Sequence, residues 1–298
     1  ACATCHQPAH AFTDSRSQAI GVTGEVHPRN TMALANVVYN ASLNWADPDL
    51  GRLEEQMKIP MFGFEPVEMG ITGHEDEVLT RLHIEPRYQR LFDEAFPGDE
   101  SPISLDNVIL AIASFERTLV SGSSVYDRYV YWDDRESLSD SARRGMRLFF
   151  SAKLACSECH AGFNFSGPVI EEGVDVAPTF HNTALYSLDA AGSYPDDNQG
   201  LFEHTGVAED MGRFRAPTLR NIALTAPYMH DGSVPTLEAV IEHYAAGGRA
   251  SRNPWKSPLL SGFEISADES RDLVSFLESL TDRAFLEDPR FENPWGPP

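Results

Sequence analysis

The sequence predicts an all-α protein built of two domains, with long irregular loops joining its helices. Three observations support this prediction. Apolar residues recur at helical spacing in several segments, whereas the alternating pattern typical of strands is sparse. The 298 residues are about enough for two domains. All four cysteines fall in two copies of one short motif, and each half of the chain holds one copy.

This motif predicts the cofactor. The two copies are Cys2-Ala3-Thr4-Cys5-His6 and Cys156-Ser157-Glu158-Cys159-His160. Cys-x-x-Cys-His is the attachment signature of c-type haem, in which the thiols bond the haem vinyl groups and the histidine becomes the proximal iron ligand. A zinc site would more often show two cysteine pairs, or one pair with a spaced histidine pair. We therefore expect two covalent haem c groups in two cytochrome c-like domains, 1–135 and 136–298.

The motif and the net charge also limit the compartment and the partners. Haem c is attached outside the bacterial cytoplasm, so we expect an exported, periplasmic protein. No secretion signal is visible and the chain opens at Ala1, so we expect the signal peptide and the native N-terminus to precede this sequence. The formal charge of −22 argues against a nucleic-acid partner. No apolar run approaches the roughly 18 residues of a membrane span.

Four segments combine a polar first residue with apolar residues at helical spacing. They run from Ser104 to Leu119, from Ser139 to Phe150, from Thr236 to Tyr244 and from Ser266 to Leu280. In the last of these, Ser266 and Glu269 have the spacing of a capping box. The segment from Tyr126 to Glu136 is the expected join between the domains. Residues 161–217 carry many Gly, Pro and Asn, so we expect irregular loops around a haem there.

The motifs together resemble those of the bacterial di-haem cytochrome c peroxidase/MauG superfamily over nearly the whole chain. The resemblance rests on both Cys-x-x-Cys-His motifs, Arg29-Asn30-Thr31, Trp45 followed by Gly51-Arg52-Leu53-Glu54-Glu55-Gln56, Glu68-Met69-Gly70, Pro217-Thr218-Leu219-Arg220-Asn221 and Thr225-Ala226-Pro227-Tyr228-Met229-His230-Asp231-Gly232. It implies that hydrogen peroxide reacts at the N-terminal haem. It also implies that the C-terminal haem supplies or stores a second oxidising equivalent.

Tyr244 indicates the branch of this family that the chain resembles. Peroxidases of the family carry a haem-ligating methionine fourteen residues after the histidine of the Tyr-x-His-Asp-Gly block, whereas MauG-type enzymes carry tyrosine. Here the fourteenth residue after His230 is Tyr244. A thioether ligand favours Fe(II), whereas a phenolate is a hard anion that favours Fe(III) and higher oxidation states. The resemblance therefore implies Tyr244 as the sixth ligand of a haem that holds an oxidising equivalent.

Without the resemblance, the pattern around Tyr244 leaves other interpretations open. Tyr244 belongs to the apolar stripe of the helix that begins at Thr236, so it could be an ordinary core residue. His243 is the neighbouring alternative ligand, although it lies about 100° around the helix from Tyr244. Met211 and Met229 are more remote alternatives.

The resemblance also implies the groups of the peroxide pocket. Cleavage of the O–O bond needs a group that moves a proton from the inner to the outer oxygen. Glu68 is expected in this role beside the haem of His6, with Gln56 as a hydrogen-bonding neighbour and Pro60 shaping the open face. The interval from Gln56 to Glu68 is two residues longer than usual in the family, so Glu65 remains an alternative.

Two histidines lie where some peroxidases of the family carry a histidine that blocks the open haem face. Neither His10 nor His27 matches that loop well, and we interpret His27 as a loop histidine. The expected ferric site is therefore open and needs no reductive activation.

Four further residues are assigned through the resemblance to the space between the haems. Trp45 matches the family tryptophan there, and its oxidisable indole can pass an oxidising equivalent between the porphyrins. Asn30 and the backbone carbonyls of Thr225 and Pro227 match an inter-haem Ca²⁺ site. An all-oxygen ligand set suits this hard cation.

The chain departs from MauG in one respect. MauG carries a surface tryptophan before its second haem motif, which passes oxidising equivalents to its protein substrate. The matching residues here, 151–155, contain no aromatic residue. Trp132, Trp255 and Trp295 are interpreted as structural, so we expect a different substrate or docking route.

Three functional hypotheses follow. The first is a MauG-like enzyme that uses hydrogen peroxide to oxidise an aromatic residue of a partner protein. Tryptophan is the expected residue, and the MbnH-type tryptophan-oxidising group is one variant of this hypothesis. The second is a peroxide-scavenging cytochrome c peroxidase that receives electrons from a small cytochrome or cupredoxin. The third is a non-enzymatic di-haem electron carrier, which predicts two six-coordinate low-spin haems.

Overall fold

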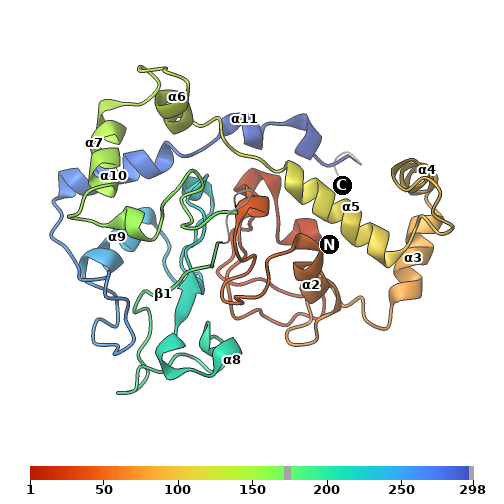
Figure 1. Ribbon diagram of the computed structural model, residues 1–298, viewed down its shortest axis with the longest axis horizontal. Coiled ribbons are helices and arrows are strands. Elements are labelled where there is room, and N and C mark those ends of the chain that lie inside the picture. Colours follow the sequence, from red (N-terminus) through yellow and green to blue (C-terminus); the bar gives the residue numbers. More distant parts are fainter. Residues whose placement is uncertain (171–175, 295–298) are drawn as a thin grey trace.

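The computed structural model describes residues 1–170 and 176–294, and within them the chain is mainly helical (Figure 1). The α-helices are α1 (Leu53–Gln56), α2 (Lys58–Phe62), α3 (Glu75–His83), α4 (Pro86–Ala95), α5 (Leu105–Thr118), α6 (Val125–Tyr131), α7 (Asp140–Phe149), α8 (Phe202–Thr205), α9 (Leu237–Ala245), α10 (Ala267–Glu278) and α11 (Arg283–Leu286). None of these helices is long and apolar enough to cross a bilayer. Trp295 lies outside the described residues.

Short 3-10 helices and one small sheet complete the structure. The 3-10 helices are η1 (Cys2–Thr4), η2 (Pro8–His10), η3 (Val37–Tyr39), η4 (Cys156–Glu158), η5 (Ala208–Asp210), η6 (Ile222–Leu224) and η7 (Pro289–Phe291). Strands β1 (Phe180–Asn182) and β2 (Arg213–Arg215) pair antiparallel, with His181 opposite Phe214. The expectation of a purely all-α fold with only irregular loops over 161–217 is wrong in this detail. Three-residue strands are too short for an alternating pattern to be visible in the sequence.

The four predicted long helices are confirmed, and each begins at the predicted residue. The hydroxyls of Ser104, Ser139, Thr236 and Ser266 each accept a hydrogen bond from the backbone N–H three residues later, at the starts of α5, α7, α9 and α10. The capping box of Ser266 and Glu269 is also present. These caps satisfy N–H groups that the first helical turn leaves unpaired, so the hydroxyl residues fix the helix starts.

The two halves of the chain share a local arrangement beside their long helices. Asn36 and Asn221 both adopt the left-handed conformation, with φ of 59°, and they begin η3 and η6. The backbone N–H of Asn36 donates to the carbonyl of Leu119, and that of Asn221 donates to Leu280, at 2.8 and 3.0 Å. Leu119 follows α5 and Leu280 follows α10. Each asparagine therefore joins the start of its 3-10 helix to the end of the long helix in the same half of the chain.

The buried apolar residues form two main clusters, one from each half. The first draws on residues 37–113 and the second on residues 126–280. Figure 1 shows α2 to α5 on one side of the molecule and α6 to α10 on the other. Tyr126 belongs to the second cluster although it precedes residue 136. The expected boundary between 135 and 136 stays a prediction.

The segment after α10 returns to the N-terminal half. Figure 1 shows α11 crossing toward α5. Phe285 and Phe291 pack there with Phe12 and Leu119 in a third buried cluster. The ring of Phe12 lies 5.7 Å from that of Phe285 and 6.0 Å from that of Phe291. Residues from both ends of the sequence therefore build one small core.

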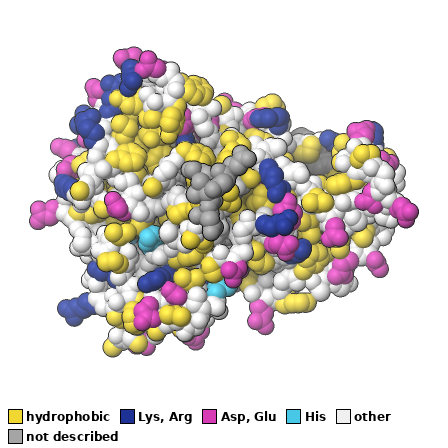
Figure 2. Space-filling model, in the orientation of Figure 1, with side chains coloured by type: hydrophobic (Ala, Val, Ile, Leu, Met, Phe, Trp, Pro, Cys, Tyr) yellow, Lys and Arg dark blue, Asp and Glu magenta, His cyan; other side chains and the backbone are white. Residues whose placement is uncertain are grey.

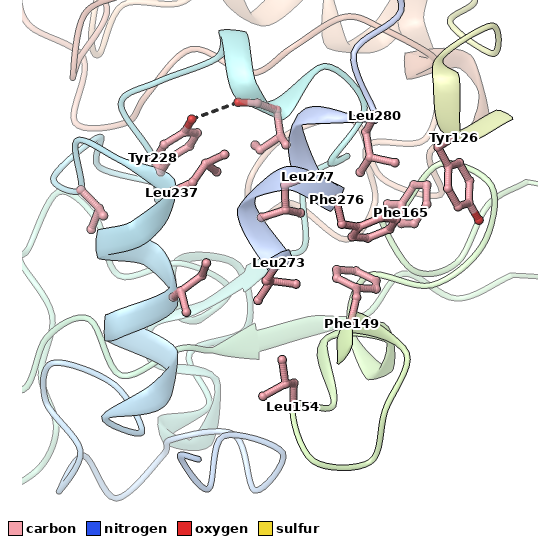
Figure 3. Packing of buried hydrophobic residues seen from close by; sticks show 13 residues of the cluster. Tyr126, Phe149, Leu154, Phe165, Tyr228, Leu237, Leu273, Phe276, Leu277 and Leu280 are labelled. Carbon is pink, nitrogen blue, oxygen red and sulfur yellow. Dashed lines mark hydrogen bonds between the residues drawn. The ribbon is translucent and has the colours of Figure 1, made fainter. Parts of the chain in front are cut away.

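The core of the C-terminal half depends on a close crossing of α7 and α10. A Cβ atom added at Gly145 would lie 1.9 Å from the carbonyl oxygen of Asp272, so only glycine permits this approach. The Asp272 carboxylate accepts hydrogen bonds from Ser141 and Arg144 of α7 at 2.6 and 2.7 Å. Figure 3 shows side chains of α7, α9 and α10 packed in the cluster that this crossing supports, with Phe165 between Phe276 and Tyr126.

Candidate functional site

The two cysteine motifs adopt the same local structure. In each, the first cysteine begins a 3-10 helix, η1 or η4. The backbone N–H of His6 donates to the carbonyl of Cys2 at 2.9 Å, and that of His160 donates to Cys156 at 3.0 Å. All four cysteines are free thiols. Each turn thus presents two thiols and one imidazole together, as covalent haem attachment requires.

Both motif histidines are oriented by a backbone carbonyl. The Nδ1–H of His6 donates to the Phe12 carbonyl at 2.8 Å, and that of His160 donates to the Phe165 carbonyl at 2.9 Å. Both acceptor residues have a positive φ, 64° at Phe12 and 51° at Phe165. Burial lowers the pKa of both imidazoles, so the rings are neutral. Because Nδ1 carries the proton, Nε2 is left as the iron-binding atom.

Tyr244 lies in the same cavity as the second motif. This cavity is lined by Cys156, Cys159, His160 and Tyr244 among others. The other stripe residues of α9, namely Leu237, Val240 and Ile241, line it as well, so the predicted apolar face of this helix faces the cavity. Burial, and then the nearby thiols of Cys159 and Cys156, raise the pKa of Tyr244. A phenol this buried loses its proton only beside a cation, such as a ferric iron.

His243, Met211 and Met229 are the alternative ligands considered for this haem. Both ring nitrogens of His243 are hydrogen-bonded, Nε2 to the Thr183 carbonyl at 2.9 Å and Nδ1 to the Arg249 backbone N–H at 3.2 Å. It does not line the cavity, and neither does Met211, whereas Met229 does. The orientation of α9 therefore favours Tyr244 over its neighbour His243.

The polar groups of the cavity fit a cofactor that carries carboxylates. Burial lowers the pKa of Arg215 to about 10, and no carboxylate among the described residues forms an ion pair with it. The buried Nε2 of His230 and Oγ1 of Thr31 have no hydrogen-bond partner among the described residues. All three residues line the cavity. Because buried charges and N–H groups require partners, these atoms suit the propionates of haem.

The tautomer of His230 follows from its neighbours. Arg29 Nε donates to Asn198 Oδ1 at 2.9 Å, which fixes the orientation of this amide. Asn198 Nδ2 therefore donates to His230 Nδ1 at 3.1 Å. Burial lowers the pKa of His230, so its ring is neutral and Nε2 carries the proton. The Nε2–H of His230 is thus an unpaired hydrogen-bond donor in the cavity wall.

Glu68 lies near the first motif. Burial raises the pKa of the Cys5 thiol, and the charges of Asp14 and Glu68 raise it further. Glu68 Oε1 lies 3.4 Å from His27 Nε2. Pro60 is adjacent, because its carbonyl accepts the backbone N–H of Met69, which follows Glu68, at 2.9 Å. The structure therefore brings Glu68 and Pro60 together beside the first motif.

The alternative acid, Glu65, occupies a different environment. It is exposed and precedes Pro66 in a cis peptide bond. The charge of Glu68 raises the pKa of Cys2, Cys5 and His6. This proximity to the first motif favours Glu68, and the choice between the two acids stays a prediction. The role of Gln56, which ends α1 one turn before Pro60, stays a prediction.

His27 is a site residue that the sequence did not reveal. Its Nδ1 accepts the backbone N–H of Arg29 at 3.2 Å, so Nε2 carries the proton and can donate toward Glu68. The backbone N–H of Val22 donates to the Glu68 carbonyl at 2.9 Å, which joins the hairpin of His27 to the segment of Glu68. No local signal in the sequence pairs these residues, since 41 positions separate them.

Trp45 and the three expected calcium ligands line the cavity of the second motif. Trp45 is 8% exposed and its Nε1–H donates to the Asn30 carbonyl at 2.8 Å. Asn30 Nδ2 donates to the carbonyls of Arg16 and Ser17, so its Oδ1 remains available. Oxygen atoms suit Ca²⁺, and the calcium site of Asn30, Thr225 and Pro227 stays a prediction.

Known proteins resemble the chain over most of its length. A family model described as di-haem cytochrome c peroxidase matches residues 1–135, and one described as RoxA-like, cytochrome c-like matches residues 213–246. Methylamine utilization protein MauG of Methylorubrum extorquens is 35% identical, covering 94% of this chain and 72% of that protein. Cytochrome c551 peroxidase of Pseudomonas aeruginosa is 31% identical, covering 99% and 76%.

One solved structure resembles the whole fold closely. It is the crystal structure of a MauG-like protein associated with microbial copper homeostasis, with a TM-score of 0.96 and 41% identity. The match covers 99% of this chain and 87% of that one. The arrangement of helices and loops described above is therefore shared with a solved relative.

Proposed function

The chain belongs to the di-haem cytochrome c peroxidase/MauG family, and from this premise we propose that it is a MauG-like, protein-modifying enzyme. It uses hydrogen peroxide to oxidise an aromatic residue, a tryptophan, of a partner protein. The observation that carries this proposal is the position of Tyr244, which lines one cavity with Cys156, Cys159 and His160. An oxygen ligand from this residue stabilises iron in high oxidation states, which a protein-oxidising enzyme needs.

The proposed cofactors are two haem c groups and one Ca²⁺. Cys2, Cys5 and His6 would hold the first haem, and the second motif with Tyr244 would hold the other. When bound, the haem pair supplies the capacity to accept two oxidising equivalents from peroxide. Arg215, Thr31 and His230 would bind its carboxylates in the cavity. Asn30, Thr225 and Pro227 would bind the calcium ion.

The chain itself supplies proton transfer at the first site. Glu68 takes the proton from the inner peroxide oxygen and returns it to the outer oxygen, which leaves as water. His27 holds Glu68 in position through the contact of 3.4 Å. Pro60 keeps the open face clear of a protein ligand, and Gln56 donates a hydrogen bond there. Trp45 connects the two sites, since its indole is oxidisable and lies buried in the cavity wall.

The proposed compartment is the periplasm, because covalent haem attachment takes place there in bacteria. The 41% identical relative is associated with microbial copper homeostasis, and this supports a partner protein from the same process. The net charge of −22 favours a neutral or basic partner surface.

Mass spectrometry of candidate partner proteins after peroxide treatment tests the proposed function. We expect a defined mass change on one tryptophan with the native enzyme and none with Tyr244→Phe. Ferric spectra of the two proteins provide the control for ligation. An unchanged ferric spectrum in Tyr244→Phe, or a sulfur or imidazole ligand in the native protein, would contradict the assignment.

Peroxide scavenging is the second candidate, and the 31% identity with cytochrome c551 peroxidase over 99% of the chain favours it. It predicts fast steady-state turnover of peroxide with a reduced small cytochrome or cupredoxin, and no product on a partner protein. A non-enzymatic electron carrier would show neither reaction. Two measurements on one preparation therefore distinguish the three hypotheses. They are peroxide turnover with a reduced small cytochrome or cupredoxin, and modification of a partner protein.

A further inference from the structure

A cluster of aromatic rings extends from Trp45, Phe214 and His230, which line the haem cavity, to two tyrosines that do not line it. The ring of His230 lies 6.5 Å from Trp45, and it stacks on Phe214 at 3.7 Å between ring centres. Two tyrosines lie beyond it. The rings of Tyr186 and Tyr194 are 6.3 and 6.1 Å from that of His230. Both phenols are therefore one ring contact from His230 and two from Trp45.

The two tyrosines differ in exposure. Tyr194 is 1% exposed, and Trp45, Phe214 and His230 are also buried. Tyr186 is partly exposed. It does not line the haem cavity, so its exposed edge faces the outside of the protein. Tyr186 is therefore the ring through which this cluster reaches the surface.

The two tyrosines also differ in the acceptor of the phenol proton. The Tyr186 hydroxyl donates to Asp231 Oδ2 at 2.5 Å. The Tyr194 hydroxyl donates to the amide oxygen of Asn182 at 2.9 Å. A carboxylate can take up a proton, whereas a primary amide cannot do so near neutral pH. Only Tyr186 combines a ring contact with a base that can accept its proton.

The chemistry of phenol oxidation makes this acceptor decisive. Loss of one electron turns a phenol into a very strong acid, so oxidation is favourable only where the proton can leave at the same time. Burial, and then the hydrogen bond and charge of Asp231, raise the pKa of Tyr186 to about 12, so the phenol keeps its proton until it is oxidised. Asp231 is 8% exposed and its Oδ1 accepts the backbone N–H of Ser233 at 3.0 Å, which fixes the carboxylate beside the phenol.

We propose that Tyr186 is a redox-active relay residue that carries oxidising equivalents from the Trp45 cluster to the protein surface, with Asp231 as its proton acceptor. This inference rests on the proposed function, in which hydrogen peroxide is the oxidant. Tyr186 gives one electron through His230 and Trp45 to the oxidised haem pair. Its O–H bond breaks and the proton moves to the Asp231 carboxylate. The Tyr186 radical then takes one electron from the partner's tryptophan, and Asp231 returns the proton.

The overall balance closes after two such transfers. Peroxide receives two electrons and two protons and leaves as two water molecules. The partner tryptophan loses two electrons and releases two protons to solvent, which match the two protons that peroxide takes up, and Tyr186 and Asp231 return to their starting states. Each transfer moves one electron and one proton between neighbours, so no charge accumulates on the buried carboxylate.

A second aromatic path is less suited to this role. Phe165, which orients His160, lies 5.2 Å from Tyr126, and Tyr126 lies 6.4 Å from the exposed Tyr131. Burial raises the pKa of Tyr126 to about 12, as it does for Tyr186. However, no hydrogen bond joins Tyr126 or Tyr131 to a carboxylate among the described residues. Tyr131, the exposed tyrosine of this second path, therefore serves as a comparison in the test of the relay.

Electron paramagnetic resonance of the holoenzyme, frozen after mixing with peroxide in the absence of partner, tests the relay. Protein grown with ring-deuterated tyrosine identifies any tyrosyl signal. We expect a tyrosyl radical in the native enzyme and in Tyr194→Phe, and its loss in Tyr186→Phe. Asp231→Asn should remove it as well, since an amide cannot accept the proton. Persistence of the signal in Tyr186→Phe, or its loss in Tyr131→Phe, would overturn the proposal.

The rate of partner oxidation tests the relay separately from the proposed function. Tyr186→Phe should leave the peroxide-induced change in the haem spectrum intact and slow partner oxidation about tenfold or more, whereas Tyr194→Phe should stay within about twofold of the native rate. If Tyr186→Phe oxidises the partner at the native rate, the relay is wrong while the enzyme class stands. If the native enzyme does not modify any partner but shows the Tyr186 radical, the relay stands and the proposed substrate is wrong.

Discussion

The two cysteine motifs have nearly the same proximal structure, yet the residues opposite them differ completely. In both, a histidine donates through Nδ1 to a carbonyl of a phenylalanine in the left-handed conformation, at 2.8 and 2.9 Å. Near the first motif we expect Glu68 with its neighbour His27, both partly exposed. The cavity of the second motif is lined by Tyr244, on the apolar face of α9. The attachment motif thus fixes one side of each site, and distant residues set its chemistry.

From this difference we expect the first site to handle proton transfer and the second to handle electron transfer. The first site offers a carboxylate and an imidazole that solvent can reach, so protons can enter and leave there. The second site offers a phenol among aliphatic side chains, where a change of charge must be compensated by the metal. We therefore expect substitutions at the first site to change peroxide cleavage and those at the second to change what happens afterwards.

Glu68→Gln should have the largest effect. The amide cannot move the peroxide proton, so the rate of the peroxide-induced change in the haem spectrum should fall about 10²- to 10⁴-fold. Stopped-flow absorption measures this rate, and Glu65→Gln is the matched control because Glu65 is exposed. An equal loss of rate in the Glu65 variant, or a native rate in the Glu68 variant, would contradict the assignment of peroxide proton transfer to Glu68.

Tyr244→Met should have the second largest effect, by making the second site like that of a peroxidase. A thioether no longer stabilises the oxidised iron, so partner oxidation should fall about 10- to 100-fold while turnover with a reduced small cytochrome increases. Tyr228→Phe is the control, since its hydroxyl donates to the Ile222 carbonyl in the core. Unchanged ferric spectra in the methionine variant would place the ligand elsewhere.

Gly145→Ala should destabilise the C-terminal half by overpacking the crossing of two helices. The new methyl group would meet the Asp272 carbonyl oxygen and the Phe276 side chain, so α7 and α10 must move apart. Overpacking of this kind costs about 1–3 kcal/mol of unfolding free energy. Denaturant unfolding measures it. Gly122→Ala, with nothing within 4 Å of the added carbon, should change stability by less than about 0.5 kcal/mol.

Glu116→Gln should have the smallest effect, and it should depend on pH. Burial raises the pKa of Glu116 from 4.5 to about 7, so unfolding releases a proton between these values and stability falls as pH rises through them. The glutamine variant should therefore gain more stability over the native protein at pH 8 than at pH 5. Thermal unfolding at both values checks this, with the exposed Glu94→Gln as control. Equal gains at the two pH values would contradict the assignment to burial.

Much of the second site could be predicted because its residues follow local rules. Thr236 caps α9, and the 3.6-residue period then directs Leu237 and Tyr244 to the same side. The first site was harder, because loop residues have no periodicity that says where a side chain points. Glu68 and Glu65 lie three residues apart in one loop, so no local pattern distinguishes the two acids.

Other contacts could not be predicted from the sequence because they join segments that are far apart along the chain. Arg215 is a cavity residue only because β2 lies beside Trp45, whose carbonyl accepts the Arg215 backbone N–H at 2.8 Å. Tyr186 and Asp231 meet across 45 positions. Such pairs depend on the course of long loops, which turn residues permit but do not specify.

The packing of Phe285 and Phe291 against Phe12 has a consequence for biogenesis. Phe12 holds the imidazole of the first motif, and its aromatic neighbours are synthesised about 270 residues later. The haem motif that leaves the ribosome first is therefore the one whose surroundings are completed last. The packing around the first motif is therefore complete only when α11 and η7 have taken their places.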